Sequence, residues 1–271
     1  MKDWFRFEEA KDVEFIRINL PGVVAVFSTR HGGVSRPPFE SLNMAFHVGD
    51  DSQDVAANRQ RFAGAVGVPL NRTVCAQQVH GTNIKVVSSE DWGKGVYNQE
   101  EAIPETDAMI TAEKDVILEA FFADCVPVYL VDPVKGVVGL AHAGWKGTIN
   151  GIAGKTVLRM SKEFGCSPWN CFGFIGPSIG PCCYYVGEEV LGQVDLGQGG
   201  TAFPVIKKQG KLMLDLWAAN KNDLVSVGLL PGNIGIAGIC TRCDTRFFSY
   251  RRDGGITGRM AALISLLKTE G

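Results

Sequence analysis

Five short apolar runs follow one another between residues 73 and 141, and they restrict the fold of this chain more than any other feature. Turn residues separate the runs, which cover residues 73–79, 83–88, 116–122, 126–131 and 136–141. Apolar runs of this length between turn signals are typical of buried strands. We therefore expect consecutive strands of one buried sheet.

A glycine-rich turn follows the last run, and the apolar spacing after it predicts a helix that Gly165 ends. The residues expected on one side of this helix are Ile149, Ile152, Ala153, Val157, Met160 and Phe164. Further helices are predicted from the capping residue Ser52 onward, over 215–227 and over 259–267, and further strands over 22–29, 171–176 and 233–240. These elements interleave irregularly, not as a βαβ repeat. We predict an α+β fold, with residues 1–271 forming a single layered domain in which helices flank a mixed sheet.

Composition excludes several classes of protein. The net charge of −2 gives no basic surface for nucleic acid. Glu119 and Asp124 interrupt the longest apolar stretch, 116–131, so it predicts core strands and no membrane span. The charged start does not resemble a signal peptide, and eight cysteines without an export signal are expected to stay thiols. We expect a cytoplasmic protein.

Three potential metal ligands stand at the ends of predicted strands. His80 and His142 each lie beside a glycine-containing turn, and Cys125 lies between two apolar runs. Their separations are too long for a zinc finger but suit a site where adjacent strands meet at one rim. Two imidazoles and one thiolate would leave the fourth tetrahedral position of a zinc ion open, as in catalytic zinc sites. The alternative, which spacing alone favours, is a buried cysteine and two hydrogen-bonded histidines.

The stretch 139–148, "GLAHAGWKGT", is close to a phosphate-binding loop but fails its pattern, because Trp145 stands where lysine is required. The helix start near Thr148 would still present free N–H groups to an anion, with Lys146 adding positive charge. A tight turn that needs glycine for its backbone is the alternative. The loops 28–35 and 247–260 combine arginine with glycine in the same way, and each could equally be a solvated turn.

Other polar residues leave their roles open. Asp124 either bonds turn amides or orients a ligand. Asp107 at a strand start is the available carboxylate for acid–base chemistry, but such residues are more often structural. The C-x-x-C pair Cys240 and Cys243 could be completed by Cys182 and Cys183. We expect core thiols at these four positions, because adjacent cysteines rarely ligate one tetrahedral ion together.

Seven motifs in this order resemble the bacterial laccase-domain family, once called multicopper polyphenol oxidases and now described as zinc-dependent purine nucleoside phosphorylases. They are "STRHGGVS", "SLNMAFHVGD", "QQVHG", "ADCVPV", "HAGWKGT", "IGPSIGPCCYYVG" and "FFSYRRDGG-TGR". The resemblance implies one α+β domain and a zinc held by His80, Cys125 and His142. It implies phosphorolysis of adenosine and inosine, related activity on methylthioadenosine, and deamination of adenosine. One departure is Tyr185, where the family pattern has glutamate.

The chain has too few histidines for the multicopper oxidase that the older family name describes. A blue-copper site with a trinuclear cluster needs many imidazoles, and this chain has four histidines and no H-x-H pair. We therefore reject the multicopper mechanism. A single copper ion could still occupy the His80–Cys125–His142 ligands, because copper outcompetes zinc for such donors.

For substrate contacts, we predict that phosphate or ribose binds a set of polar residues, namely Arg30, Asn43, Arg59, Lys146 and Arg251. Three other functions stay open. The resemblance also implies a hydrolase that edits a wrongly built muramoyl–serine bond in a cell-wall precursor. Cys125 could instead be the nucleophile of a hydrolase, with His142 or His80 as base. A binding module without catalysis is the third.

Overall fold

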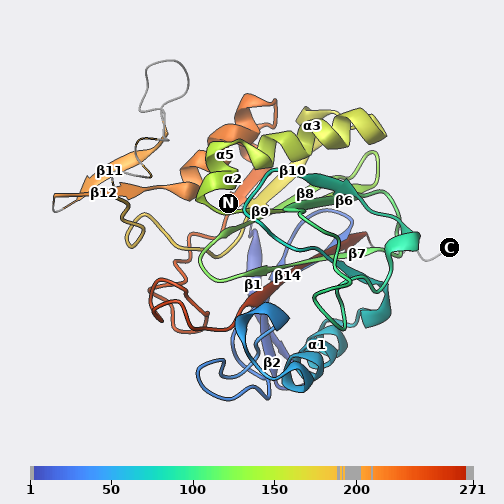
Figure 1. Ribbon diagram of the computed structural model, residues 1–271. Helices are drawn as coiled ribbons and strands as arrows, with labels where there is room; N and C mark the ends of the chain where they lie inside the picture. Colours follow the sequence, from blue (N-terminus) through green and yellow to red (C-terminus); the bar gives the residue numbers. More distant parts are fainter. Residues whose placement is uncertain (1–2, 188–189, 191, 193–202, 209, 267–271) are drawn as a thin grey trace.

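The computed structural model of the chain describes residues 3–187, 190, 192, 203–208 and 210–266. Two six-stranded sheets lie against one another, and helices cover their outer faces (Figure 1). The first sheet has the order β1 (Phe5–Ala10), β2 (Val13–Ile18), β3 (Val23–Ser28), β14 (Met260–Leu266), β7 (Ile117–Phe122) and β4 (Thr73–Cys75). The second has the order β13 (Ile234–Ile236), β10 (Phe172–Ile175), β8 (Val126–Asp132), β9 (Val137–Ala143), β6 (Ala108–Thr111) and β5 (Ile84–Val86). A separate ribbon pairs β11 (Val205–Lys208) with β12 (Lys211–Leu214).

The predicted α+β class is confirmed, but the expectation of one sheet is wrong. The five apolar runs divide between the sheets: β4 and β7 belong to the first, and β5, β8 and β9 to the second. The chain crosses from β7 to β8 through a turn in which Asp124 has a φ of 84°. Strands β7, β8 and β9 are buried at every residue, as is typical of strands covered on both faces, and apolar runs of this kind do not reveal which sheet a strand joins.

The predicted helix over 259–267 is also wrong. Residues Met260–Leu266 form β14, which pairs antiparallel with both β3 and β7 in the middle of the first sheet. All seven of its residues are buried. A continuously apolar segment has no polar face to distinguish a helix from a central strand, and here tertiary pairing overrides the helix propensity of alanine and leucine.

Helices form the two outer layers. Helix α1 (Ser52–Val66) packs on the first sheet, and its cap is Asp51 rather than the predicted Ser52. On the second sheet lie α2 (Trp145–Ile149), α3 (Ile152–Phe164) and α5 (Leu216–Ser226). The single helix predicted after the glycine-rich turn is thus two, because Gly151 has a φ of 69° between them. Gly165 ends α3 as predicted. Short 3-10 helices cover Phe46–Val48, Leu70–Arg72, Ser89–Asp91, Pro168–Asn170 and Pro231–Asn233.

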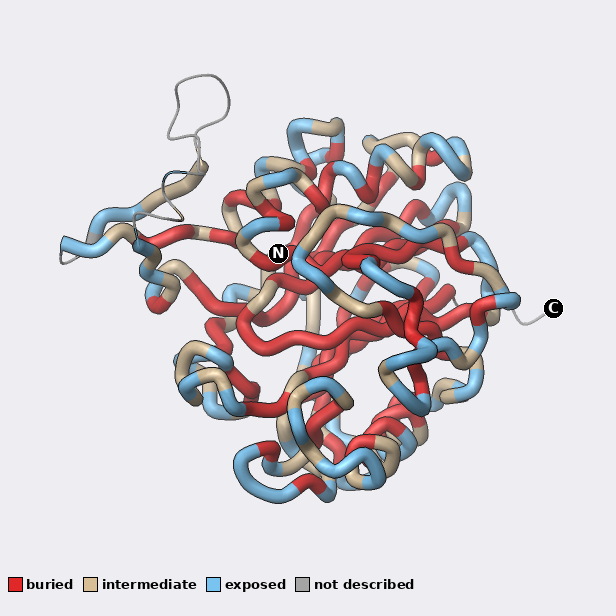
Figure 2. The backbone as a smooth tube through the Cα atoms, viewed as in Figure 1, coloured by how far each residue is buried: buried red, intermediate tan, exposed pale blue. Residues whose placement is uncertain are grey.

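The main core lies between the two sheets, whose strands are buried along most of their length (Figure 2). Phe27 and Phe122 of the first sheet pack in the same cluster as Tyr129 and Phe174 of the second. The Tyr129 hydroxyl also donates a hydrogen bond of 2.7 Å to the carbonyl of Val26 across the interface. This packing and the hydrogen bond fix the position of one sheet relative to the other. No helix within the described ranges is long and apolar enough to cross a membrane.

Candidate metal centre

Strand register brings Cys125 and His142 to the same rim of the second sheet. Cys125 comes directly before β8, and His142 is the penultimate residue of β9. The two strands are antiparallel, and His142 lies opposite Pro127. The end of one strand therefore meets the start of the other, so the thiol and the imidazole meet although 16 residues separate them in the sequence.

Asp107 positions the third donor, His80. The backbone N–H groups of Val79, His80 and Gly81 all donate to its carboxylate, at 3.2, 2.9 and 2.7 Å. His80 has a φ of 61°, a left-handed conformation that histidine adopts more readily than most residues. Three hydrogen bonds from backbone N–H groups to one carboxylate hold the backbone in this conformation. They turn the imidazole toward the rim where Cys125 lies.

The ligand atoms of His80, Cys125 and His142 lie within 4.8 Å of one another, so this group could hold a metal ion. Nδ1 of His142 lies 2.9 Å from an oxygen of Asp107, whose side chain is fully buried. This contact directs Nε2 of His142 toward the other donors, an arrangement typical of metal-binding histidines. A strand-start aspartate is more often structural, but in this fold the one carboxylate of Asp107 positions both histidines.

The electrostatics of the group favour a thiolate. Burial raises the pKa of Cys125, but the charge of His142 and hydrogen bonds with His142 and His80 outweigh it and lower that pKa to about 6. For His142, burial lowers the pKa, whereas the Cys125 thiolate and Asp107 raise it to about 9. The pair is therefore a thiolate and an imidazolium near pH 7. A metal cation that binds His142 displaces the imidazolium proton.

The three donors line a cavity of about 520 Å³. Besides the donors, its walls include Gln78, Trp145, Tyr184, Tyr250, Arg251 and Arg259. Pockets of about 300–1,000 Å³ with apolar and aromatic walls and a few polar groups are typical binding sites for small molecules. The three potential metal ligands therefore line a cavity that a nucleoside-sized molecule can enter.

Of the five predicted substrate contacts, the structure places Arg251 in this cavity. Its guanidinium lies 4.8 Å from the Tyr185 ring and donates to the Tyr185 carbonyl at 3.0 Å. Lys146 is exposed, with its ammonium 5.6 Å from the Trp145 ring, and does not line the cavity. Tyr185, the departure from the family pattern, therefore supports Arg251 through its ring and its carbonyl.

The other three predicted contacts lie outside the cavity lining. Arg59 is fully buried and donates to the carbonyls of Met44, Gly95 and Val96. Its guanidinium also lies 4.4 Å from the ring of Phe121, so this arginine links loops inside the protein and does not reach a ligand.

The remaining two predicted contacts, Arg30 and Asn43, form hydrogen bonds with the backbone of other loops. Arg30 donates to the carbonyl of Glu40. Asn43 is buried, and its side-chain oxygen accepts the backbone N–H of Arg259. The residue that Asn43 positions is thus one that lines the cavity.

Sequence reasoning missed several cavity residues, above all Arg259 and His47. Both stand inside motifs that carried the family resemblance, so the motifs themselves contained the signal. Trp145, Tyr184 and Tyr250 were also missed as cavity residues. They come from three separate segments, and only the folded chain brings them together.

Asp124 joins loops around the cavity. One of its carboxylate oxygens accepts the Thr241 hydroxyl and the other accepts the backbone N–H of Arg251, both at 2.7 Å. Its backbone carbonyl accepts the N–H of Ile179 at 2.9 Å. Of the two roles left open, the structure supports bonding of turn groups.

The expectation of core thiols in the C-x-x-C region holds for Cys183 and Cys240, which are buried, and is wrong for the other two cysteines. Cys182 and Cys243 are exposed, and their sulfurs gather with those of Cys183 and Cys240 within 4.8 Å of one another.

The sequence matches a model of the family described as Multi-copper polyphenol oxidoreductase laccase over residues 24–267. The chain belongs to this family. Among its members, the purine nucleoside phosphorylase YlmD of Geobacillus stearothermophilus is 44% identical over 97% of both chains. The crystal structure of YlmD from the same species has a TM-score of 0.92 to this fold, at 42% identity, covering 98% of this chain and 100% of that one. A relative named adenosine deaminase RL5, from an unknown prokaryotic organism, is 34% identical over 93% of this chain and 96% of its own.

In this member of the laccase family, we expect Gly144→Ala to weaken metal binding about tenfold or more. The φ and ψ of Gly144, −66° and 173°, suit alanine. A Cβ there would lie 2.8 Å from Cδ2 of His80 and 3.2 Å from Sγ of Cys125, so it would push two donors apart. Zinc retained against a competing chelator measures the effect. Gly232→Ala is the matched control, since a Cβ there meets nothing within 4 Å. Equal zinc affinity in both variants would contradict the proposed centre.

Proposed function

We propose that this chain is a purine nucleoside phosphorylase that acts on adenosine, inosine and methylthioadenosine, with zinc held by His80, Cys125 and His142. One observation carries the proposal: the metal-ligand group and two arginines line the same nucleoside-sized cavity. The names of the relatives point to the same activity. Phosphorolysis needs a bound anion beside the ribose, and this cavity offers the positive charge to hold one.

The donor set suits zinc. Two nitrogens and one sulfur, with Asp107 behind His142, match the ligands and the supporting carboxylate that zinc sites use. Copper could occupy the same donors, because it binds such ligands more tightly than zinc does. Bound zinc would act as a Lewis acid that polarises an oxygen of phosphate or ribose.

Arg259 and Arg251 are the proposed phosphate contacts. The Arg259 side chain donates through Nη1 to the carbonyls of Thr257 and Gly258, at 2.7 and 3.0 Å, and its backbone N–H is held by Asn43. These bonds orient the guanidinium before any ligand arrives. An oriented guanidinium fork suits phosphate better than a flexible ammonium does. This assigns the anion to the two arginines and not to Lys146.

Aromatic walls provide a place for the purine. The rings of Trp145, Tyr184 and Tyr250 all line the cavity. Aromatic side chains stack on bases through their π faces, whatever the base. We therefore place the purine among these rings and the ribose toward the metal ligands.

His47 is the proposed proton-transfer group, a role that sequence reasoning left unassigned. It lines the cavity, and burial together with the charge of Arg259 lowers its pKa. Its imidazole is therefore neutral at pH 7 and able both to donate and to accept a hydrogen bond. Asp124, the cavity carboxylate, has both oxygens engaged by Thr241 and Arg251.

The proposal is tested on one preparation of the full chain, purified without added metal. Zinc and copper per chain are counted, and inosine is incubated with and without phosphate while ribose 1-phosphate and hypoxanthine are followed. One zinc per chain more in the wild type than in Cys125→Ala, with base release that requires phosphate, would support the proposal. Zinc without nucleoside turnover would reject it in favour of the hydrolase that edits muramoyl–serine bonds. Equal zinc in the wild type and in Cys125→Ala, with Cys125 of the wild type readily alkylated, would favour a cysteine nucleophile.

Adenosine deamination is a second activity for the same centre, favoured by the relative named adenosine deaminase. The assay is the release of inosine and ammonia from adenosine in the absence of phosphate. No ammonia from a zinc-loaded sample that cleaves inosine would exclude deamination and leave phosphorolysis standing.

Arg259→Gln should raise the KM for phosphate about 10- to 100-fold, since a hydrogen bond to a charged group contributes about 1.5–3 kcal/mol. The KM for inosine should change far less. Lys146→Gln is the matched control, because its exposed ammonium lies outside the cavity lining, and its KM for phosphate should not change. A raised KM for phosphate in the Lys146 variant alone would show that phosphate binds at the helix start near Lys146, as the sequence predicted.

A further inference from the structure

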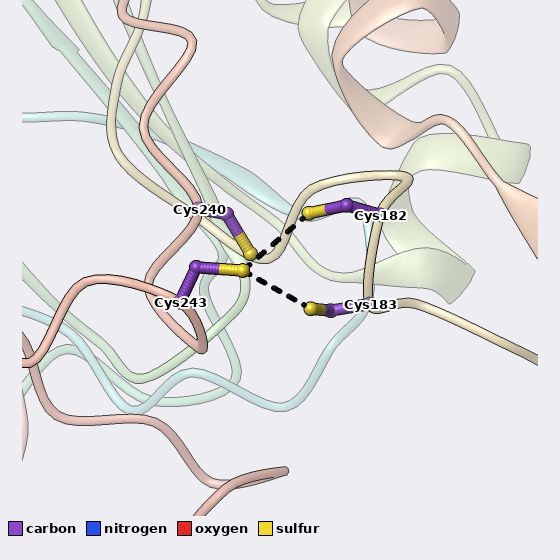
Figure 3. Close-up of side chains that lie close together, drawn as sticks. All are labelled: Cys182, Cys183, Cys240 and Cys243. Atoms are coloured by element: carbon purple, nitrogen blue, oxygen red, sulfur yellow. Dashed lines mark hydrogen bonds between the residues drawn. The ribbon is translucent and has the colours of Figure 1, made fainter.

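A second group of metal-ligating side chains lies outside the centre described above. Figure 3 shows the sulfurs of Cys182, Cys183, Cys240 and Cys243 turned toward one another from two loops. Sγ of Cys243 lies 3.3 Å from that of Cys183 and 3.7 Å from that of Cys182, and all four lie within 4.8 Å of one another. From this geometry we propose that the four cysteines bind one structural zinc ion.

The sulfur separations match a tetrathiolate site. Zn–S bonds of about 2.3 Å in a tetrahedron place the sulfurs about 3.8 Å apart. All four cysteines are free thiols in the structure. Four sulfur ligands fill the coordination sphere and leave no open position, which is the pattern of structural rather than catalytic zinc. Each thiol enters as a thiolate, so binding releases the thiol protons to solvent.

The local backbone explains how adjacent cysteines can share one ion. The N–H groups of Cys183 and Tyr184 both donate to the carbonyl of Gly180, at 2.9 and 3.0 Å, so this segment turns as in a helix. Successive side chains then diverge by about 100° instead of pointing to opposite faces as in a strand. Both sulfurs can therefore face the same side.

The second loop makes a matching turn. The N–H groups of Cys243 and Asp244 donate to the carbonyl of Cys240, at 3.0 and 2.9 Å. A β-bridge between Ser178 and Cys240 holds this turn beside the first. The two pairs of sulfurs are thus brought together by backbone bonds that do not depend on the metal.

Nearby donors favour thiolates at this position. The backbone N–H of Gly180 donates to Sγ of Cys240 at 3.3 Å, and Nη1 of Arg242 donates to Sγ of Cys183 at 3.4 Å. Donors of this kind support the ligands of metal sites, and the arginine offsets part of the negative charge of four thiolates. Cys182 and Cys243 are exposed, so zinc can enter from solvent.

The proposed ion would join two segments that form walls of the cavity. The first segment includes Ile179 and Tyr184, and the second continues to Tyr250 and Arg251. Its function would be to hold these walls together. The proposal concerns a site separate from the His80–Cys125–His142 centre and does not depend on nucleoside turnover.

The first test counts zinc per chain in the full-length wild type, in Cys243→Ser and in Cys171→Ser. Cys243→Ser should contain one zinc fewer than the wild type, because its sulfur contacts both cysteines of the other loop. Cys171→Ser should keep the wild-type count: Cys171 is not a member of the four-cysteine group and donates to the Ser167 carbonyl, which a serine hydroxyl can also do. Equal zinc in the wild type and in folded Cys243→Ser would overturn the proposal.

A second test keeps all four cysteines and removes the other centre. Cobalt added to metal-free Cys125→Ala should give the thiolate-to-metal charge-transfer bands of a tetrathiolate site, and their absence would overturn the proposal. Titration of the denatured, chelator-treated wild type should find eight thiols, the full cysteine content. Two thiols fewer, with no zinc lost on Cys243→Ser, would show a disulfide instead.

Discussion

Cys125→Ala should lose the metal of the first centre and lower nucleoside turnover at least about 10³-fold. A Lewis-acid metal contributes several kcal/mol to transition-state stabilisation, and each 1.4 kcal/mol or so corresponds to a tenfold change in rate. The variant should still fold, because Cys125 lies at the rim of the second sheet and is only half-buried. The measurements are zinc per chain and phosphate-dependent release of hypoxanthine. Full turnover in this variant would reject the metal mechanism.

Loss of activity in Cys125→Ala does not separate a metal ligand from a nucleophile, so Cys125→Asp is the matched variant. Aspartate can ligate zinc at about 2.0–2.2 Å, close to the distance for cysteine sulfur, and it removes the thiol. As a ligand replacement, it should retain zinc and recover part of the turnover. If it retains zinc but is as inactive as the alanine variant, the cysteine-nucleophile hypothesis is favoured.

Asp107→Asn should lower metal affinity about 10- to 100-fold, the usual effect of losing a group that supports metal ligands. One carboxylate oxygen accepts from the backbone of His80 and from Nδ1 of His142, and the other accepts from Val79 and Gly81. Either orientation of the asparagine amide turns its NH₂ group toward N–H donors. We therefore also expect a loss of about 1–3 kcal/mol in the free energy of unfolding, because buried donors lose their acceptor.

The matched control is Asp215→Asn. Asp215 caps α5 through one oxygen that accepts the N–H of Ala218, and asparagine caps helices as well as aspartate does. Its free energy of unfolding should change by no more than about 0.5 kcal/mol. Zinc titration and chemical denaturation of both variants check the prediction. Equal effects of the two substitutions would contradict the positioning role of Asp107.

Local pattern predicted many of the elements of this fold. The helix boundaries at Asp215 and Gly165 follow from capping chemistry, which acts over one turn of chain and so is visible in sequence. The wrong prediction of a helix over 259–267 arose because long-range pairing, not local pattern, determines this segment. Strand β14 is defined by pairing with β3 and β7, which lie far away in the sequence, and its own residues carry no alternation. The division into two sheets was missed for the same reason.

The donor residues of the candidate centre were visible as histidine and cysteine at strand ends, and the resemblance selected them as ligands. The supporting residues were not visible. Asp107 looks like any aspartate at a strand start until the fold places His142 against it. The cysteine pairs at 182–183 and 240–243 were set aside on an argument that holds for extended chain, whereas both pairs lie in turns.

By itself, the sequence determined the α+β class, the family and the types of side chain available for metal chemistry, because these depend on composition, local periodicity and motif order. The tertiary structure decided which polar residues share a cavity. Arg59 and Arg259 are the same kind of residue, yet the first is fully buried and bonded to backbone carbonyls of distant loops, whereas the second lines the cavity beside the candidate metal-binding group. A buried charge needs hydrogen-bond partners, and these differ at the two positions because only the folded chain brings the partners close.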